Sequence, residues 1–149
     1  MQLQRRDIAL DEKLLIRKAA EARTFSYSPY SGYMVGAALL TSSGKIYQGC
    51  NIENAAFTPG ICAERTAFAK AVSEGEMSFE AIAVVGGPKD AGPEYAYPCG
   101  VCRQVMMEFV DPRKFRVVVG RDETDYSVHA LSELLPFGFG PDNLNNTPD

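Results

Sequence analysis

The 149-residue sequence predicts a layered α/β domain, in which strands and helices alternate along the chain. Short apolar segments bounded by glycine and proline, typical of buried strands, recur between longer segments whose apolar residues follow helical spacing. The chain shows no internal repeat and no linker-like stretch, and its length suits one hydrophobic core. We therefore expect a single domain over residues 1–149, with a core over about residues 10–144 and a polar C-terminal tail over residues 145–149.

The N-terminal part of the chain predicts a helix followed by a β-hairpin. Residues 11–25 begin with acidic residues and carry apolar residues at helical spacing, which are Leu14, Leu15, Ala19, Ala22 and Phe25. The run from Ser28 to Gly32 ends this helix. Residues 33–40 predict a strand, and a turn at residues 42–44 leads into a second strand through residues 46–50. The two strands are expected to pair as a hairpin.

The rest of the chain predicts further alternating elements. After an irregular stretch that ends at Pro59-Gly60, residues 62–74 predict a second helix. Residues 81–85 predict a short buried strand, from which a polar loop runs to Pro98. A third helix is expected from about Cys99 to Asp111-Pro112, with its apolar face at Val101, Val105, Met106 and Phe109. Residues 115–119 predict another buried strand, and residues 131–135 a short helix.

Composition and charge narrow the function classes. The hydrophobic fraction of 46% and the charged fraction of 23% are typical of a folded globular protein. A net charge of −4 argues against a protein whose main partner is a nucleic-acid backbone. The N-terminus has no apolar run resembling a secretory signal, and no stretch approaches the roughly twenty apolar residues of a membrane helix. We expect a cytoplasmic protein with reduced thiols, no membrane partner and no nucleic-acid partner.

The cysteines form a candidate metal site. Cys99 and Cys102 are three residues apart at a predicted helix start, so their thiols share one face. Cys62 opens another predicted helix. If the two helix starts meet, three sulfurs surround one ion, and a tetrahedral zinc keeps its fourth position for water, as in a catalytic site. Both helix N-termini favour the thiolate forms.

Two charged residues beside Cys62 suit catalysis more than structure. Glu64 is placed to point at the open side of the metal, where a carboxylate can take a proton from water and pass it on. Arg65 is a candidate donor of hydrogen bonds to a ligand sulfur, which would offset the net charge of three thiolates. The single histidine, His129, is far from the cysteines in sequence and is expected to have a surface or packing role.

A structural zinc module is the alternative that the cysteines allow. In that interpretation Cys50 provides a fourth ligand and closes the site, and the protein binds partners without catalysis. Cys50 ends an apolar strand pattern, however, where a buried, inert thiol is the commoner arrangement. A structural site also gives no reason for Glu64 in the first turn after Cys62. The joint pattern Cys-x-Glu and Pro-Cys-x-x-Cys therefore favours a catalytic site.

Several segments closely resemble the small cytidine deaminases, in register over about residues 10–144. The Cys-x-Glu…Pro-Cys-x-x-Cys pattern is the signature of zinc-dependent deaminases of cytosine and adenine. The resembling segments are residues 27–31, 35–40, 49–55, 62–67, 71–75, 98–105, 133–136 and 139–141. The resemblance implies a three-layer α/β/α fold with a five-stranded mixed sheet. It also implies a homotetramer with active sites shared between subunits, and hydrolysis of cytidine or deoxycytidine to the uridine product and ammonia.

The resemblance also implies roles for individual residues. One Zn²⁺ per subunit is held by Cys62, Cys99 and Cys102, and Glu64 is the catalytic proton shuttle. Asn51 and Glu53 are implied to bind the ribose, and the backbone of Ala63 and Glu64 to meet the pyrimidine edge. The ring of Tyr33 is implied to lie beside the sugar and base, and Phe139 to reach the base from a neighbouring subunit.

Two residues depart from the family pattern, and both bear on substrate or interface. Tyr33 stands where phenylalanine is common, so its hydroxyl needs a partner or access to water. Phe57 stands where tyrosine is usual.

The nearest alternative functions are deamination of aminopyrimidine antibiotics, of deoxycytidylate or of bases within polynucleotides. The Asn51/Glu53 pair favours a free sugar hydroxyl, but a contact to the 3′-hydroxyl does not select between ribo- and deoxyribonucleosides.

Overall fold

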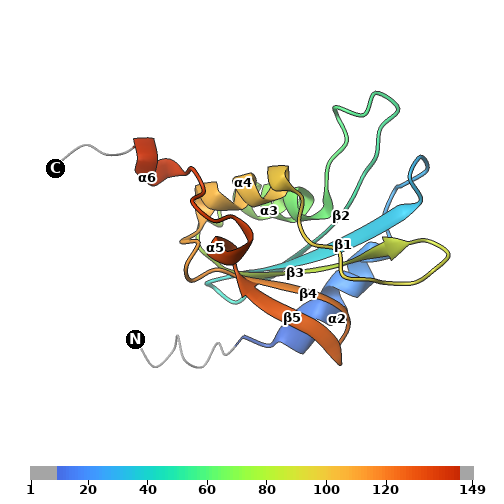
Figure 1. The fold of residues 1–149 in the computed structure, drawn as a ribbon, viewed down its shortest axis with the longest axis horizontal. Helices are drawn as coiled ribbons and strands as arrows, with labels where there is room; N and C mark the ends of the chain where they lie inside the picture. Colours follow the sequence, from blue (N-terminus) through green and yellow to red (C-terminus); the bar gives the residue numbers. More distant parts are fainter. Residues whose placement is uncertain (1–9, 145–149) are drawn as a thin grey trace.

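A computed structural model describes residues 10–144 as one five-stranded sheet with helices on both faces (Figure 1). The predicted α/β class with a mixed sheet is confirmed, whereas the predicted tail over residues 145–149 lies outside the described residues. No helix within residues 10–144 combines the length and the apolar character that crossing a membrane requires. The strands are β1 (Tyr33–Thr41), β2 (Ile46–Cys50), β3 (Phe79–Pro88), β4 (Arg116–Asp122) and β5 (Asp125–Ala130). The helices are α2 (Glu12–Arg23), α3 (Ala63–Ser73), α4 (Gly100–Phe109), α5 (Leu131–Leu134) and α6 (Pro141–Leu144).

The strand order in the sheet is β2-β1-β3-β4-β5. The predicted hairpin is present, because β1 pairs antiparallel with β2, from Gly36 opposite Cys50 to Leu40 opposite Ile46. Strand β3 runs antiparallel to β1 and parallel to β4, and β4 pairs antiparallel with β5. The helix α4 forms the crossover between the two parallel strands. The starts of α3 and α4 lie close together over the sheet, beside Val84 of β3.

Two apolar clusters, one on each face of the sheet, make up the core. Helix α2 packs on one face through Leu15, Ile16 and Ala19. Helices α3, α4 and α5 cover the other face through Phe68, Met106 and Leu131. The side chains of β3 alternate between these clusters, since Ile82 faces the α3 side and Ala81 the α2 side, as the period of two requires. Figure 1 shows α2 on the opposite side of the sheet from α3 and α4.

Two glycines of the hairpin let the helices approach the sheet at backbone distance. A Cβ on Gly36 would lie 2.0 Å from the carbonyl oxygen of Ala19 in α2. A Cβ on Gly49 would lie 2.5 Å from the carbonyl oxygen of Ala63 and 2.6 Å from the amide nitrogen of Ala67, both in α3. The position of the first turn of α3 is therefore set directly by the backbone of β2.

One strand was not anticipated, and two local expectations were wrong. The strand β5 follows a turn at residues 123–124 that the sequence pattern did not reveal, and all of its residues are half-buried. Helix α2 ends at Arg23, so Phe25 is 79% exposed instead of completing the apolar face. In α4 the buried face is formed by Cys102, Met106 and Met107, and Val101 is exposed.

Candidate metal centre and active site

The three cysteines meet at the N-termini of two helices. Cys62 is the N-cap residue of α3, Cys99 is the N-cap residue of α4, and Cys102 lies in the first turn of α4. Their sulfurs all lie within 4.8 Å of one another, and the Sγ atoms of Cys62 and Cys99 are 3.8 Å apart. A tetrahedral ion with bonds of 2.3 Å would separate its sulfur ligands by about 3.8 Å. The arrangement therefore fits one zinc ion.

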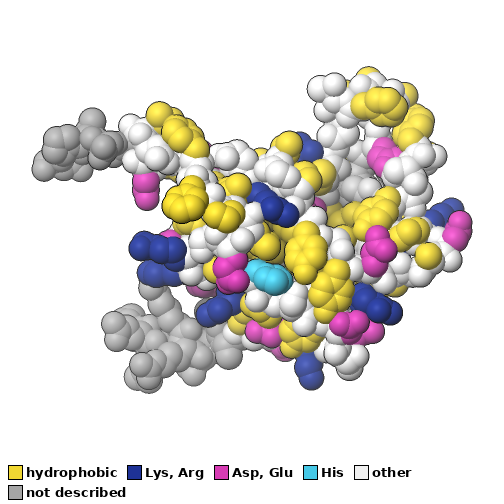
Figure 2. All heavy atoms as spheres, viewed as in Figure 1, with side chains coloured by type: hydrophobic (Ala, Val, Ile, Leu, Met, Phe, Trp, Pro, Cys, Tyr) yellow, Lys and Arg dark blue, Asp and Glu magenta, His cyan; other side chains and the backbone are white. Residues whose placement is uncertain are grey.

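Within residues 10–144, no other group of His, Cys, Asp and Glu side chains is placed to hold a metal ion. Cys50 is half-buried and does not belong to the group, and burial raises the pKa of its thiol. This placement argues against the four-thiol structural module. His129 also lies apart: its ring packs edge-on against Tyr97, with ring centroids 5.7 Å apart, on the face shown in Figure 2.

The electrostatics of the thiols favour a bound cation. A hydrogen bond with Cys102, together with one from Arg65, lowers the pKa of the Cys62 thiol to about 5. The pKa of Cys102 is raised by its hydrogen bond to Cys62 and by burial. One thiolate thus opposes the ionisation of its neighbour, because like charges at this distance repel. A divalent cation relieves that repulsion and allows all three sulfurs to ionise.

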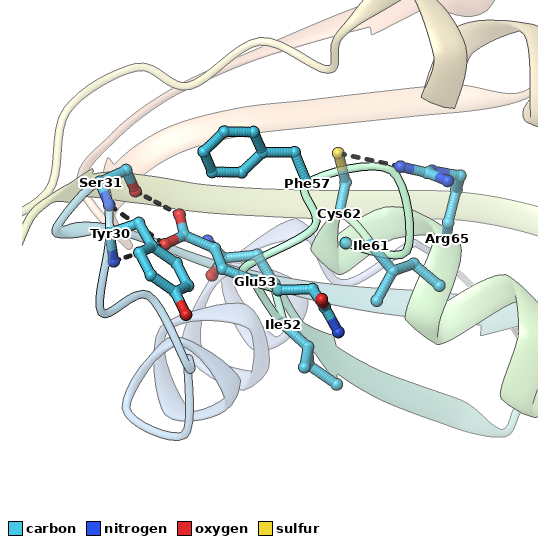
Figure 3. A pocket seen from close by; sticks show the side chains of 11 residues that line it. Tyr30, Ser31, Ile52, Glu53, Phe57, Ile61, Cys62 and Arg65 are labelled. Carbon is cyan, nitrogen blue, oxygen red and sulfur yellow. Dashed lines mark hydrogen bonds between the residues drawn. The ribbon is translucent and has the colours of Figure 1, made fainter.

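Arg65 donates from Nη2 to Cys62 Sγ at 3.6 Å, and Figure 3 shows the guanidinium directed at this sulfur. The pKa of Arg65 is raised mainly by this hydrogen bond. Its Nε is buried and has no hydrogen-bond partner within the described residues. The sequence predicted this contact. Positive charge placed beside a ligand sulfur compensates part of the charge of the thiolates.

Glu64 is a buried carboxyl group in the first turn of α3, with only 4% of its surface exposed. Burial, and to a smaller extent the Cys62 charge, raise the pKa of its carboxyl to about 7. A bound cation would act in the opposite sense. A carboxyl group held in this way, two residues from a metal ligand, is suited to accept and return a proton.

A cavity of about 380 Å³, here called the metal cavity, opens at the cysteines between β1, the start of α3 and the segment before α4. Its lining residues include the Cys62 and Cys99 ligands and Glu64. They also include the predicted substrate residues Tyr33, Asn51, Glu53 and Ala63. A second cavity of about 410 Å³, under the loop over residues 51–61, is drawn in Figure 3. The two cavities share Ser31, Asn51, Glu53 and Cys62 as lining residues.

The predicted pair Asn51 and Glu53 is held by other polar groups. Asn51 Oδ1 accepts from the Val35 amide at 2.9 Å and from the Ser26 hydroxyl, and Nδ2 donates to the Tyr33 carbonyl at 2.8 Å. Because an amide carries two donors and two acceptor sites, one Nδ2 hydrogen stays available.

Glu53 is fixed in a similar way. Its Oε1 accepts from the backbone amides of Tyr30 and Ser31, at 3.0 and 3.1 Å, and its Oε2 accepts from the Ser31 hydroxyl. These hydrogen bonds, led by the one from the Ser31 side chain, lower the pKa of the carboxyl. Oε2 keeps acceptor capacity for a further hydrogen bond. Figure 3 shows the carboxylate facing Tyr30 and Ser31.

The hydroxyl of Tyr33, which the family pattern left without a partner, donates to Glu94 Oε1 at 2.9 Å. Burial and this hydrogen bond raise the pKa of Tyr33 to about 12.

Phe139 lies away from the metal cavity. It is 56% exposed on the C-terminal segment, and it lines neither of the two cavities. Its carbonyl accepts from Gln104 Nε2 at 2.8 Å.

Sequence reasoning missed several lining residues of the metal cavity. Tyr95, Ala96 and Tyr97 come from the segment between β3 and α4, which has no periodic pattern. The signal that could have found them is the pair of tyrosines directly before Pro98-Cys99, since residues flanking a metal ligand must lie near the metal. Glu94 offered no signal of its own.

A family model described as the cytidine and deoxycytidylate deaminase zinc-binding region matches residues 10–120, well over half of the chain. The chain belongs to this deaminase family. A cytidine deaminase of Halalkalibacterium halodurans is 44% identical over 137 residues, covering 92% of this chain and 100% of the relative. A probable cytidine deaminase of Dictyostelium discoideum is 43% identical over 129 residues, covering 87% and 84%. The crystal structure of a cytidine deaminase from Burkholderia pseudomallei matches with a TM-score of 0.78 at 43% identity, covering 87% and 100%.

Membership of the deaminase family agrees with the geometry of the metal cavity. The cofactor of the family is zinc, and the three thiols of this chain stand at the separation that zinc requires. The five-stranded mixed sheet implied by the sequence resemblance is the sheet observed here. Zinc as cofactor and the fold class are therefore both confirmed.

Proposed function

We propose that the protein hydrolyses cytidine and deoxycytidine to uridine and deoxyuridine with release of ammonia, a reaction of pyrimidine salvage. The observation that carries the proposal is the juxtaposition of a three-thiol metal site, a buried Glu64 and the Asn51/Glu53 pair around one cavity. The names of its relatives as cytidine deaminases support it. The chemistry is addition of water at C4 of the pyrimidine and loss of the amino group.

When bound, zinc supplies a water molecule acidic enough to be deprotonated near neutral pH. Glu64 accepts the proton of that water and delivers a proton to N3 of the ring. The water oxygen forms a bond to C4. Glu64 then accepts the remaining proton of that oxygen and delivers it to the departing amine, as the bond from C4 to the amino nitrogen breaks. Ammonia leaves, and the ring keeps the oxygen. Burial of Glu64 supports this role, because water that competes for the proton is excluded.

The sugar is proposed to bind through its 3′-hydroxyl. Asn51 has one Nδ2 hydrogen available, and Glu53 has acceptor capacity on Oε2. A single hydroxyl can accept from the first and donate to the second. The other hydrogen bonds of both side chains hold them in place before the substrate arrives, which reduces the entropy lost on binding. The backbone of Ala63, at the first position of α3, is proposed to meet the pyrimidine edge.

The substrate is proposed to be a nucleoside and not a nucleotide. The residues that line the metal cavity include two carboxylates and no lysine or arginine. The Arg65 guanidinium at the neighbouring cavity is directed at Cys62. Among the described residues, neither cavity thus offers a free cation to a phosphate, and Glu53 would repel a phosphate.

We further propose a homotetramer in which Phe139 of one subunit stacks over the base bound by its neighbour. Exposed aromatic rings support an assembly, since two of them, Tyr30 and Phe57, pack edge-on against each other at the surface. The exposed rings include Phe25, Tyr27, Tyr30, Phe57, Phe137 and Phe139. The chain is proposed to form one domain. A cytoplasmic location is supported by the need of three ligand thiols for a reducing compartment.

The test is a spectrophotometric assay of cytidine, deoxycytidine and their monophosphates. We expect turnover of both nucleosides, and a rate at least about 100-fold lower with Glu64→Gln, the lower end of a general acid–base contribution. The variant should keep its zinc, measured by elemental analysis. Glu80→Gln, an exposed glutamate on β3, is the matched control and should be unchanged. Near-normal turnover by Glu64→Gln, or preferred turnover of the monophosphates, would contradict the proposal.

A further inference from the structure

The wall segment, residues 89–98, joins β3 to the Cys99 ligand and forms one side of the metal cavity. It contributes Tyr95, Ala96 and Tyr97 to the lining. It contains no helix or strand of its own, and its one backbone pairing with the sheet is an isolated bridge between Gly86 and Glu94. A loop of this kind keeps a defined position only where other contacts hold it.

The backbone of the wall segment rests directly on the end of β3. The Glu94 amide donates to the Gly86 carbonyl at 2.6 Å. A Cβ on Gly86 would lie 2.7 Å from the Ala96 Cβ, and one on Gly87 would lie 2.4 Å from the Gly92 carbonyl oxygen. The segment therefore returns over the strand without a gap, which places Ala96 at the cavity.

The side of the wall segment that faces β5 is tied by aromatic side chains. The Tyr95 hydroxyl donates to Asp125 Oδ1 at 2.7 Å, and the ring of Tyr97 packs against His129. Both partners lie in β5. These contacts hold the segment on the β5 side. On the β1 side its backbone is held only at its start, where the Lys89 amide donates to the Gly32 carbonyl at 2.8 Å.

The opposite tie runs through Tyr33, on the substrate side. The Tyr33 hydroxyl donates to Glu94 Oε1 at 2.9 Å, its backbone amide donates to Ser31 Oγ at 3.0 Å, and its carbonyl accepts from Asn51. The Ser31 hydroxyl in turn donates to Glu53. A continuous series of hydrogen bonds therefore connects the proposed sugar-binding pair to the wall segment.

We propose that the Tyr33 hydroxyl and the Glu94 carboxylate form a positioning pair, which holds the wall segment against β1 at the width that a nucleoside requires. The inference rests on the proposed function, since it concerns the same cavity. The bond to Glu94 occupies the hydroxyl, so the Tyr33 ring enters the cavity as an apolar surface in one orientation. A wall and a ring that are fixed before binding lower the entropic cost of binding the substrate. The pair should thus affect binding more than the chemical step.

The experiment compares Tyr33→Phe, Glu94→Ala, the double variant and Glu94→Gln. The first two remove the hydrogen bond from either end, whereas glutamine keeps an acceptor oxygen for the hydroxyl. Tyr126→Phe is the matched control, because it removes a hydrogen bond between tyrosine and the Glu12 carboxylate at α2, outside the metal cavity. For each protein, kcat and KM for cytidine, zinc content, Kd for uridine and hydrogen–deuterium exchange of residues 89–98 are measured.

We expect Tyr33→Phe and Glu94→Ala each to raise KM and the uridine Kd about 3- to 10-fold, the effect of one hydrogen bond, with kcat within about 2-fold. The double variant should be no worse than either single variant, and Glu94→Gln should stay within about 2-fold of the unaltered protein. Amide exchange in residues 89–98 should be faster in Tyr33→Phe, and Tyr126→Phe should change none of these quantities.

Unchanged KM and Kd in Tyr33→Phe, or multiplied effects in the double variant, would overturn the positioning pair. A loss of kcat or of zinc in place of a rise in KM would also overturn it. Failure of the proposed function gives a different result, since the unaltered protein would then not turn over cytidine. Amide exchange would still report whether the hydroxyl ties the wall segment to β1.

Discussion

Gly49→Ala should damage the active site from a distance, through the backbone of α3. Gly49 lies in β2 and lines neither of the two cavities described above. The added Cβ would lie 2.5 Å from the Ala63 carbonyl oxygen and 2.6 Å from the Ala67 amide nitrogen. Both are backbone atoms of the first turn of α3, so rotation of a side chain cannot relieve the contact.

The size of the displacement follows from these distances. Ordinary van der Waals contact begins at 3.4 Å, so the first turn of α3 must move by about 0.9 Å relative to β2. That turn carries Cys62 and Glu64. Misplacement of catalytic groups by about 1 Å costs on the order of 100-fold in rate. Overpacking of this kind also destabilises by about 2–3 kcal/mol, or about 4–12 °C in Tm for a chain of this size.

The assay measures kcat/KM for cytidine together with the thermal unfolding midpoint. We expect kcat/KM to fall about 100-fold at a temperature where circular dichroism shows Gly49→Ala to be folded. Gly44→Asn, in the turn of the same hairpin, is the control. A Cβ there meets no atom within 4 Å, so this variant strains only its own turn, at a φ of +93°, and should keep the kcat/KM of the folded protein. Activity of Gly49→Ala within about 3-fold of the unaltered protein would refute the argument that β2 sets the position of α3.

Three further outcomes are expected. Arg65→Gln should weaken zinc binding about 10- to 100-fold in a chelator competition, because the ligand sulfur loses its charged donor; equal retention would remove the assigned role. Tyr47→Phe should raise the free energy of unfolding by about 1 kcal/mol in urea titration, because its buried hydroxyl has no partner within the described residues; a lower stability would reveal a partner. The pKa of Glu53 is lower in the folded protein than in the unfolded chain. Its carboxylate therefore stays ionised at any pH above the unfolded-state pKa, and it is protonated only as the pH falls through the folded-state pKa. Between about pH 8 and pH 5, titration of Glu53 should therefore not change the KM for cytidine. Any rise in this KM below the usual glutamate pKa of about 4.3 should be absent in Glu53→Gln.

The strands and helices that bury a full face were predictable, because burial imposes a period on the sequence. The hairpin of β1 and β2, helix α3 and the buried strand β3 were all anticipated. The edge strand β5 was not, since all its residues are half-buried and no alternation results. In α4 the apolar spacing predicted a buried face that includes Val101. The buried face instead includes Cys102, because this thiol faces the candidate metal site, and Val101 is therefore exposed.

The candidate site divides in the same way. Cys62, Cys99, Cys102 and Glu64 could be predicted because their chemistry requires particular residue types at particular spacings. The wall segment could not, since its place depends on where an irregular loop returns over Gly86 and Gly87. The partner of the Tyr33 hydroxyl was anticipated as a need, but only the three-dimensional fold identifies it as Glu94.

The separation of Cys62 and Cys99 along the chain has a consequence for folding. An ion bound to both sulfurs acts as a cross-link that closes a loop of 37 residues containing the whole of β3. By the chain-entropy relation used for disulfides, such a closure restricts the unfolded chain by about 4 kcal/mol. That is a large fraction of the total stability of an ordinary domain. An ion that serves the proposed chemistry would thus also join α3 to α4, and the stability of the folded chain would depend on the supply of metal.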